Sequence, residues 1–174
     1  FKDSVHILGS GILEVIYNGK KIVFTGDLGN SPSPLLRDTE AINDADYLIM
    51  ESVYGDRNHE DREVRKGKLE EVIKENYKRK GTLIIPVFSL ERSQELLFEI
   101  DSLVENKKIP AMPIFLDSPL AIKLTKVYKK YEHYFNDRAQ AIIKTGNNIF
   151  NFTGLELTEE TEESKAILKV PNPK

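Results

Sequence analysis

Hydrophobic and polar residues alternate near the start of the chain, and two such runs are separated by a turn signal. Residues 12–17 read Ile-Leu-Glu-Val-Ile-Tyr and residues 21–25 read Lys-Ile-Val-Phe-Thr, compositions that favour β-strands. Asn18-Gly19 between them is typical of a two-residue hairpin turn. The pattern predicts an antiparallel hairpin with His6 and Asp27 just beyond its open end, so we expect these two side chains to lie close together.

Further along the chain, short apolar runs take turns with longer amphipathic segments. A continuous apolar run of four to six residues is typical of a buried strand, whereas apolar positions three and four apart indicate a helix. The predicted strands are 47–50, 82–87 and 113–117, and the predicted helices are 59–80, 89–104 with Ser89 as N-cap, 119–135 with Ser118 as N-cap, a short one within 139–151, and one from residue 158. This alternation predicts an α/β fold with a parallel sheet.

Composition narrows the chemistry. The 174 residues are 40% hydrophobic and 30% charged, which is typical of one globular domain or pieces of two. Because the chain has no cysteine, disulfides and thiolate zinc sites are excluded, and His, Asp or Glu would have to hold any metal. The net charge of −3 gives no overall basic signature, so any contact with nucleic acid would have to be local.

The apolar runs and the two ends of the chain bear on its cellular location and on whether it is part of a longer protein. No run approaches the roughly 18–20 apolar residues that span a bilayer, and no signal peptide is visible, so we expect a cytoplasmic protein with no membrane partner. The sequence begins without Met and ends on Val-Pro-Asn-Pro-Lys at residues 170–174, as if leading into a strand. We therefore expect an internal piece of a longer protein.

Two carboxylates follow predicted strands, where α/β proteins commonly place reactive groups. Asp27 stands in the glycine-bounded turn of residues 24–29, and Glu51 follows the apolar run 47–50. Each has a plain structural alternative: Asp27 can form an Asx turn, and Glu51 can cap a turn or pair with an arginine. His6 can likewise be a hydrogen-bonded turn residue. The residues alone leave both interpretations open.

Five segments, taken together and in order, resemble one family. They are His-Ile-Leu-Gly-Ser at 6–10, Phe-Thr-Gly-Asp-Leu-Gly at 24–29, Glu-Ser-Val-Tyr-Gly-Asp-Arg at 51–57, Pro-Val-Phe-Ser-Leu-Glu-Arg-Ser-Gln-Glu-Leu-Leu at 86–97, and Asp-Ser-Pro-Leu-Ala at 117–121. The set resembles the β-CASP branch of the metallo-β-lactamase-fold nucleases, which includes bacterial and archaeal ribonucleases and the endonuclease of pre-mRNA 3′-end cleavage. The resemblance implies part of a metallo-β-lactamase αββα sandwich over residues 1–56, followed by part of a parallel-sheet α/β β-CASP cap domain over residues 57–174.

The resemblance also implies a chemistry, namely zinc-dependent hydrolysis of RNA phosphodiester bonds with two zinc ions in the full-length protein. It makes His6 a zinc ligand, Asp27 the bridging ligand and a catalytic residue, and Glu51 a catalytic residue that orients a histidine. The family's His-x-His-x-Asp-His segment is absent from this chain. Most metal ligands are therefore expected upstream of Phe1, and we expect the chain by itself to bind zinc weakly and to be inactive on RNA.

Four residues of the expected cap domain are candidate RNA contacts: Ser89, Arg92, Gln94 and Lys126. The first three fall at a predicted helix start, which favours phosphate, although capping and salt-bridge roles explain them equally. RNA is the expected partner, and a homodimer is left open. Two other functions compete, a non-catalytic β-CASP scaffold subunit of an RNA-processing complex and a small-ester hydrolase on the same fold.

Overall fold

The protein divides into two compact units. In the computed structural model, the backbone is described along the whole chain, and side chains are described at residues 1–61 and 64–174. The first unit comprises Phe1–His59 and Glu132–Ala141, and the second comprises Glu60–Tyr131 and Ile142–Lys174. Glu132–Ala141 thus belongs to the first unit, although it lies inside the range expected for the cap domain. The domain boundary itself stays a prediction.

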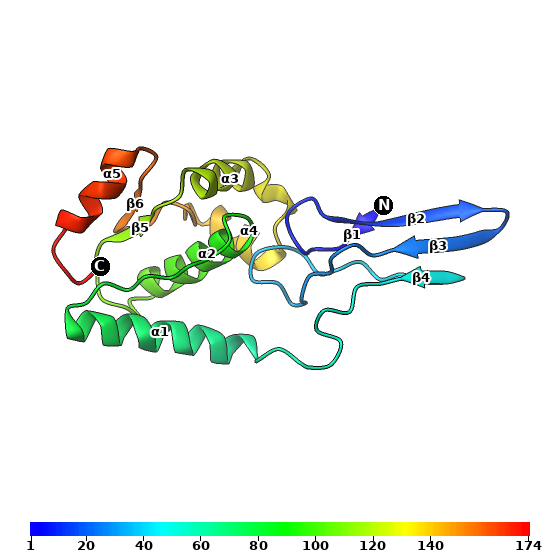
Figure 1. Ribbon diagram of the computed structural model, residues 1–174, viewed down its shortest axis with the longest axis horizontal. Helices are drawn as coiled ribbons and strands as arrows, with labels where there is room; N and C mark the ends of the chain where they lie inside the picture. The colour runs from blue at the N-terminus through cyan, green and yellow to red at the C-terminus, as the bar shows by residue number, and fades with distance from the viewer. The chain divides into compact units, whose positions relative to one another are not determined.

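A four-stranded sheet forms the first unit's regular structure (Figure 1). Its strands lie in the order β1 (Lys2–Asp3), β2 (Gly11–Tyr17), β3 (Lys20–Phe24) and β4 (Tyr47–Ile49). The first three strands are antiparallel, and β4 runs parallel to β3. Asn18 and Gly19 take φ angles of 49° and 70° in the turn between β2 and β3, as a type I′ hairpin turn requires. The predicted hairpin is confirmed.

Strand β4 forms where predicted, but the expectation that it is buried is wrong for this chain. Tyr47, Leu48 and Ile49 remain 59%, 53% and 50% exposed. Among the described strands, β4 pairs with β3 alone, so its outer edge has no partner and no layer covers its faces. Burial of a strand depends on what packs against it, and a local apolar run does not specify that layer.

The segment Glu132–Ala141 joins the first unit through one asparagine side chain. The Asn136 amide nitrogen donates to the carbonyl oxygens of Ser33, Pro34 and Leu36 at 3.1, 3.2 and 3.1 Å. Its amide oxygen accepts from the backbone N–H of Ala139 at 2.8 Å. These four bonds satisfy polar backbone groups of a loop and of a helix start that would otherwise be costly to bury.

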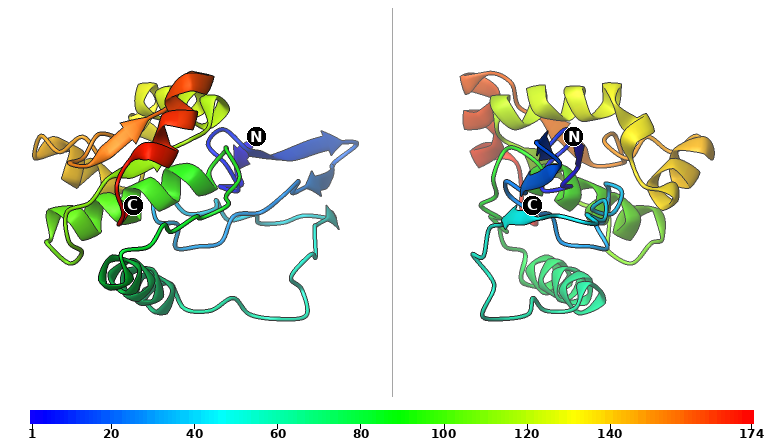
Figure 2. Two further views of the ribbon diagram at one scale, coloured as in Figure 1. Left: turned by 60° about the vertical axis from the view of Figure 1, so that its left-hand side comes forward. Right: turned by 90° about the vertical axis from the view of Figure 1, so that its right-hand side faces the viewer.

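Helices dominate the second unit. In chain order its elements are α1 (Arg62–Arg79), α2 (Arg92–Glu105), β5 (Ile114–Leu116), α3 (Pro119–Lys130), β6 (Leu155–Leu157), α5 (Thr161–Ala166) and the 3₁₀ turn η2 (Ile167–Lys169). The 3₁₀ turn η1 (Glu132–Tyr134) lies in the first unit, and α4 (Asp137–Lys144) begins there and ends in the second. Helices α2 and α3 pack together (Figure 2), burying among others Phe98, Leu103 and Ile122.

The mixed α/β class is confirmed, and the second unit holds one parallel pair, β5 with β6. Ser118 is the N-cap of α3, as predicted, and accepts from the N–H of Ala121 at 3.2 Å. Pro119 takes the first helical position, which its fixed φ favours. None of the helices in the described part of the chain is long and apolar enough to cross a membrane.

Four predictions of element bounds are wrong. Residues 82–87 form no strand, and Ile84 is 81% exposed, because among the described residues the backbone of this stretch bonds another segment at Leu83 alone, whose N–H donates to the carbonyl oxygen of Lys174. Helix α2 begins at Arg92 after an N-cap at Glu91, so Ser89 is not its cap. Helix α3 ends at Lys130 and α5 starts at Thr161, where the chain turns and local capping bonds take over.

Candidate functional site

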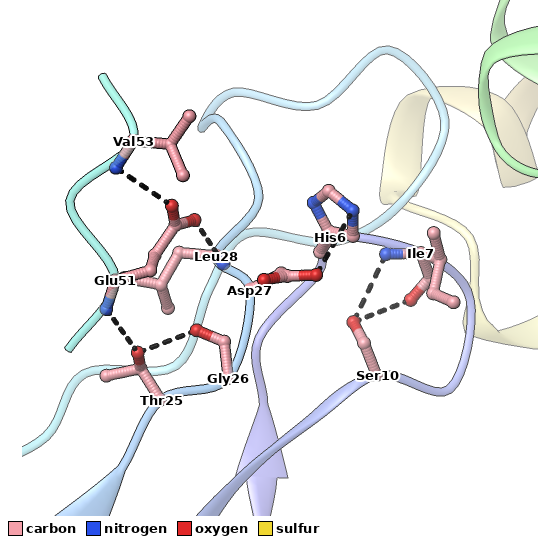
Figure 3. A network of polar contacts seen from close by, with 9 residues as sticks. All are labelled: His6, Ile7, Ser10, Thr25, Gly26, Asp27, Leu28, Glu51 and Val53. Carbon is pink, nitrogen blue, oxygen red and sulfur yellow. Dashed lines mark hydrogen bonds and ion pairs between the residues drawn. The ribbon is translucent and has the colours of Figure 1, made fainter. Parts of the chain in front are cut away.

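His6 and Asp27 lie together beyond the open end of the β2–β3 hairpin, as the sequence predicts. His6 Nε2 is 3.9 Å from Asp27 Oδ2 (Figure 3). Their side chains are 39% and 73% exposed, so both can still reach a ligand. Because β2 and β3 are antiparallel neighbours, the segment before one strand and the segment after the other meet at one end of the sheet. This meeting places an imidazole beside a carboxylate.

Gly29 allows the two loops to come this close. A Cβ atom at Gly29 would lie 2.1 Å from the carbonyl oxygen of Val5, far inside any tolerable contact. The Gly29 N–H donates to the carbonyl oxygen of Ser4 at 2.8 Å, and Val5 pairs with Leu28 in an isolated bridge. A glycine beside a candidate site often lets a ligand approach the backbone. For Gly29 the structure differs, because the glycine admits the neighbouring chain.

Ser10 fixes the loop that carries His6. Its hydroxyl donates to the carbonyl oxygen of Ile7 at 2.8 Å and accepts from the Ile7 N–H at 3.2 Å (Figure 3). The Ser10 N–H donates to the same carbonyl at 3.0 Å. Three hydrogen bonds across a four-residue turn restrict the backbone directly after His6, so the imidazole leaves a well-held loop.

Glu51 binds the loop that carries Asp27. Its Oε1 accepts from the N–H of Leu28 at 2.8 Å, and its Oε2 accepts from the N–H of Val53 at 3.4 Å (Figure 3). The Glu51 N–H donates to the Thr25 hydroxyl at 3.3 Å, so the residues on both sides of the 26–27 turn are tied to Glu51. These contacts fit the alternative in which Glu51 caps a turn. They also hold the backbone on both sides of Asp27. A catalytic role for Glu51 stays a prediction.

The donor set suits zinc, but it is incomplete. Imidazole nitrogen and carboxylate oxygen are both good zinc ligands, and a structural or catalytic site takes three or four protein ligands. His6 and Asp27 supply two. Within the side chains described at residues 1–61 and 64–174, no group of three or more His, Asp or Glu residues could hold a metal ion. Any zinc site here therefore needs further ligands.

The four predicted RNA contacts sit in different environments of the second unit. Arg92 is paired with Glu95 at 2.5 Å, and Lys126 with Glu159 at 2.7 Å. The Lys126 pair lies at the surface, where ion pairs exchange partners at little cost, whereas in the Arg92 pair the arginine is 50% exposed and Glu95 only 15%. Ser89 is half-buried in the turn before α2. All three stay predictions.

Gln94 differs from them because its side chain is fully buried. The Gln94 amide nitrogen donates to the Ser89 carbonyl oxygen at 3.2 Å and to the Thr125 hydroxyl at 2.9 Å. A direct contact with RNA would require this side chain to leave the core. The internal role was not visible in the sequence, since Gln94 stands among polar residues at a helix start and its partner on α3 lies 31 positions away.

Comparison with known proteins finds a domain match for α2 and the residues that follow it. Residues 93–174 match the family model of the Beta-Casp domain. The chain carries a Beta-Casp domain. The resemblance inferred from the five segments is thereby confirmed, and the matched range lies within the 57–174 expected for the cap. The Beta-Casp match begins at the second residue of α2 and reaches the last residue of the chain.

Relatives align well beyond the Beta-Casp domain. Ribonuclease TTHA0252 of Thermus thermophilus is 34% identical over 173 residues, which is 99% of this chain and 40% of the relative. Cleavage and polyadenylation specificity factor subunit 3 of Dictyostelium discoideum is 34% identical over 158 residues, 87% of this chain and 20% of that protein. An RNase J-like protein of Methanocaldococcus jannaschii is 36% identical over 154 residues, 86% and 36% of the two chains. The chain thus spans two fifths or less of the length of these relatives.

Proposed function

We propose that this chain is part of a metal-dependent hydrolase that cleaves RNA phosphodiester bonds. The observation that carries the proposal is the 3.9 Å approach of His6 to Asp27 in a chain that also carries a Beta-Casp domain. Matched relatives are named ribonuclease or specificity factor, and an imidazole next to a carboxylate is a donor pair that a hydrolytic metal site uses.

Zinc is the metal that fits the donors, with His6 and Asp27 among its ligands. A pair of bound zinc ions supplies hydroxide near neutral pH and stabilises the charge that develops on the phosphate. Since the described side chains hold no third ligand beside these two, the other ligands belong, on this proposal, to parts of the longer protein outside this chain. The chain alone then binds zinc weakly and does not cut RNA.

In this proposal the residues of this chain hold the metal and orient the loop that carries its ligand. Asp27 offers two carboxylate oxygens on an exposed side chain, which suits a bridging ligand. Glu51 keeps the Leu28 N–H, and hence the loop of Asp27, in place through its 2.8 Å hydrogen bond. Supporting carboxylates of this kind commonly alter metal affinity or activity by about 10–100-fold. Glu51 is therefore the residue through which this chain would tune the metal centre.

RNA binding would fall to exposed groups of the second unit. Arg92 and Lys126 can exchange their carboxylate partners for a phosphate, because the two basic side chains are 50% and 61% exposed and exposed ion pairs are worth little. Ser89 adds a hydroxyl donor at the turn before α2. Gln94 would support Ser89 from the core and would not touch the RNA.

The decisive experiment compares the full-length protein with its Asp27→Ala variant on labelled RNA. We expect the variant to lose cleavage and part of its bound zinc, since one ligand is gone. Asp38→Ala is the matched control, because Asp38 is an exposed aspartate of the same unit. Equal cleavage by the wild type and Asp27→Ala would refute the metal assignment.

A scaffold without catalytic activity is the second candidate, since one relative is named as a subunit of a specificity factor. The same experiment separates the two functions. A full-length protein that binds RNA or a processing complex, retains no zinc and cleaves nothing would be such a scaffold.

A further inference from the structure

The turn that leads into α2 has an unusual backbone. Glu91 takes φ 60° and ψ −59°, and the N–H of Arg92 donates to the carbonyl oxygen of Leu90 at 2.8 Å. This is a γ-turn with a positive central φ, a rare and strained form. Glutamate is a poor choice for the left-handed region, which glycine tolerates best. Something other than backbone preference must hold Glu91 in place.

A buried pair of side chains holds the turn from one side. The Tyr128 hydroxyl donates a short hydrogen bond to the carboxylate of Glu91. Glu91 is 3% exposed and Tyr128 is 1% exposed. Hydrogen bonds to a carboxylate in such a dry environment are strong, and they are costly to lose. Tyr128 lies on α3, so this bond joins the strained turn to a separate helix.

Gln94 holds the residues just before the strained turn. Its amide nitrogen joins the carbonyl oxygen of Ser89 to the hydroxyl of Thr125 on α3. Ser93 adds two bonds to the carbonyl oxygen of Phe88, from its hydroxyl at 2.8 Å and from its N–H at 3.2 Å. The carbonyl groups of the two residues before Leu90 thus have fixed partners. A strained backbone persists only where its surroundings determine it in this way.

These hydrogen bonds place the hydroxyl group of Ser89 beside that of Ser118. Ser89 Oγ lies 3.4 Å from Ser118 Oγ, and both side chains are half-buried, so neither is sealed in the core. Ser118 is itself fixed as the N-cap of α3. The position of Ser89 beside it depends on the path of the turn, and hence on Glu91.

We propose that Glu91 and Tyr128 are positioning residues, whose buried hydrogen bond keeps the turn strained so that the Ser89 hydroxyl stands beside Ser118 and binds a phosphate of the RNA. The inference rests on the proposed function, because it assigns Ser89 a substrate contact. Two hydroxyls at this spacing can each donate to an oxygen of one phosphate group. Strain held at such a turn is a form of preorganisation, which lowers the cost of ordering the site when RNA binds.

The test is the kinetics of RNA cleavage by the full-length protein and five variants, one of them double. Tyr128→Phe removes the hydroxyl and should raise KM about tenfold while kcat stays within about twofold, the signature of lost substrate binding. Glu91→Gln retains an oxygen that accepts from Tyr128, so its KM should stay close to that of the wild type. Ser89→Ala should raise KM as much as Tyr128→Phe does, and the double variant should be no worse than either one.

Glu91→Gly decides between positioning and plain stability. Glycine accepts the φ of 60° without strain, which offsets part of the stability lost with the buried hydrogen bond, and assays at a temperature where the variant is folded should still show KM raised about tenfold because the bond to α3 is gone. Two matched controls should leave KM unchanged. Tyr77→Phe removes a hydroxyl from α1, and Lys107→Gly relaxes another residue with positive φ, at 54°.

The outcomes separate the two hypotheses. A wild-type protein that cleaves RNA, together with a Glu91→Gly variant of unchanged KM, refutes the positioning role alone. A full-length wild type that neither binds nor cleaves RNA refutes the proposed function and this inference with it. If Tyr128→Phe does not fold, Glu91→Gly and Ser89→Ala still decide.

Discussion

Substitution of Gly29 by alanine tests whether the approach of two loops creates the metal site. The new Cβ atom would lie 2.1 Å from the carbonyl oxygen of Val5, and real Cβ contacts do not fall below 3.0 Å. The loops must therefore separate by about 0.9 Å or more. That movement stretches the 2.8 Å bond from Gly29 to Ser4 and should pull Asp27 away from His6.

The expected effect on catalysis is large for so small a change. A displacement near 1 Å of a group that positions the reaction can cost about a hundredfold in rate, so we expect Gly29→Ala in the full-length protein to lower kcat/KM for RNA by about that factor. Bound zinc, measured by mass spectrometry of the metal, should fall as well, because His6 and Asp27 can no longer bind as they did.

Gly67→Ala is the matched control for Gly29→Ala. Gly67 lies in α1 with no atom near the position of a Cβ, so alanine there should stabilise the helix by up to about 1 kcal/mol and leave cleavage unchanged. Wild-type kcat/KM together with wild-type zinc content in Gly29→Ala would show that the close approach of the loops is not needed for the site.

Three further predictions concern charge, anchoring and the role of Glu51. Burial raises the pKa of Asp101 to about 6 from 3.8, so the folded form keeps a proton that the unfolded form releases, and stability falls as pH rises from about 4 to 6. Asp101→Asn should therefore raise the free energy of unfolding at pH 8 by up to about 3 kcal/mol and flatten this pH dependence in urea titrations, whereas Glu71→Gln on exposed α1 should do neither. Asn136→Ala should destabilise the first unit by about 2–3 kcal/mol in the same titrations, because it leaves buried carbonyl groups without donors; an unchanged midpoint would contradict the anchoring role. Glu51→Ala removes the acceptor of the Leu28 N–H, so bound zinc or kcat should fall about 10–100-fold, whereas Glu51→Gln keeps an acceptor and should change both much less; unchanged zinc content and kcat in Glu51→Ala would limit Glu51 to capping the turn.

Local signals in the sequence predicted part of the fold well. The Asn18-Gly19 turn and the alternating runs on both sides determine a hairpin without help from the rest of the chain. The hairpin in turn predicted that His6 and Asp27 meet, which the 3.9 Å distance confirms. Ser118 and the proline after it predicted the start of α3, because an N-cap acts within four residues.

Predictions failed where an outcome depended on distant segments. The apolar run 47–50 and the run 82–87 look like buried strands, but burial and pairing require partners that lie far away in the sequence. Ser89 resembles an N-cap, yet ties from Gln94 and Tyr128 shift the start of α2 to Arg92. The need for glycine at residue 29 was also hidden, since it comes from the approach of Val5.

The anchoring of Asn136 has a consequence for the order in which the protein can form during synthesis. The carbonyl groups of Ser33 and Leu36 accept from Asn136, which is synthesised about 100 residues later. Leu35 and Phe135, both fully buried, are likewise separated by Glu60–Tyr131, the larger part of the second unit. Contacts so distant in sequence slow folding. A ribosome must therefore release most of the second unit before the first can close, and until then Leu35 is an exposed site for chaperones or aggregation.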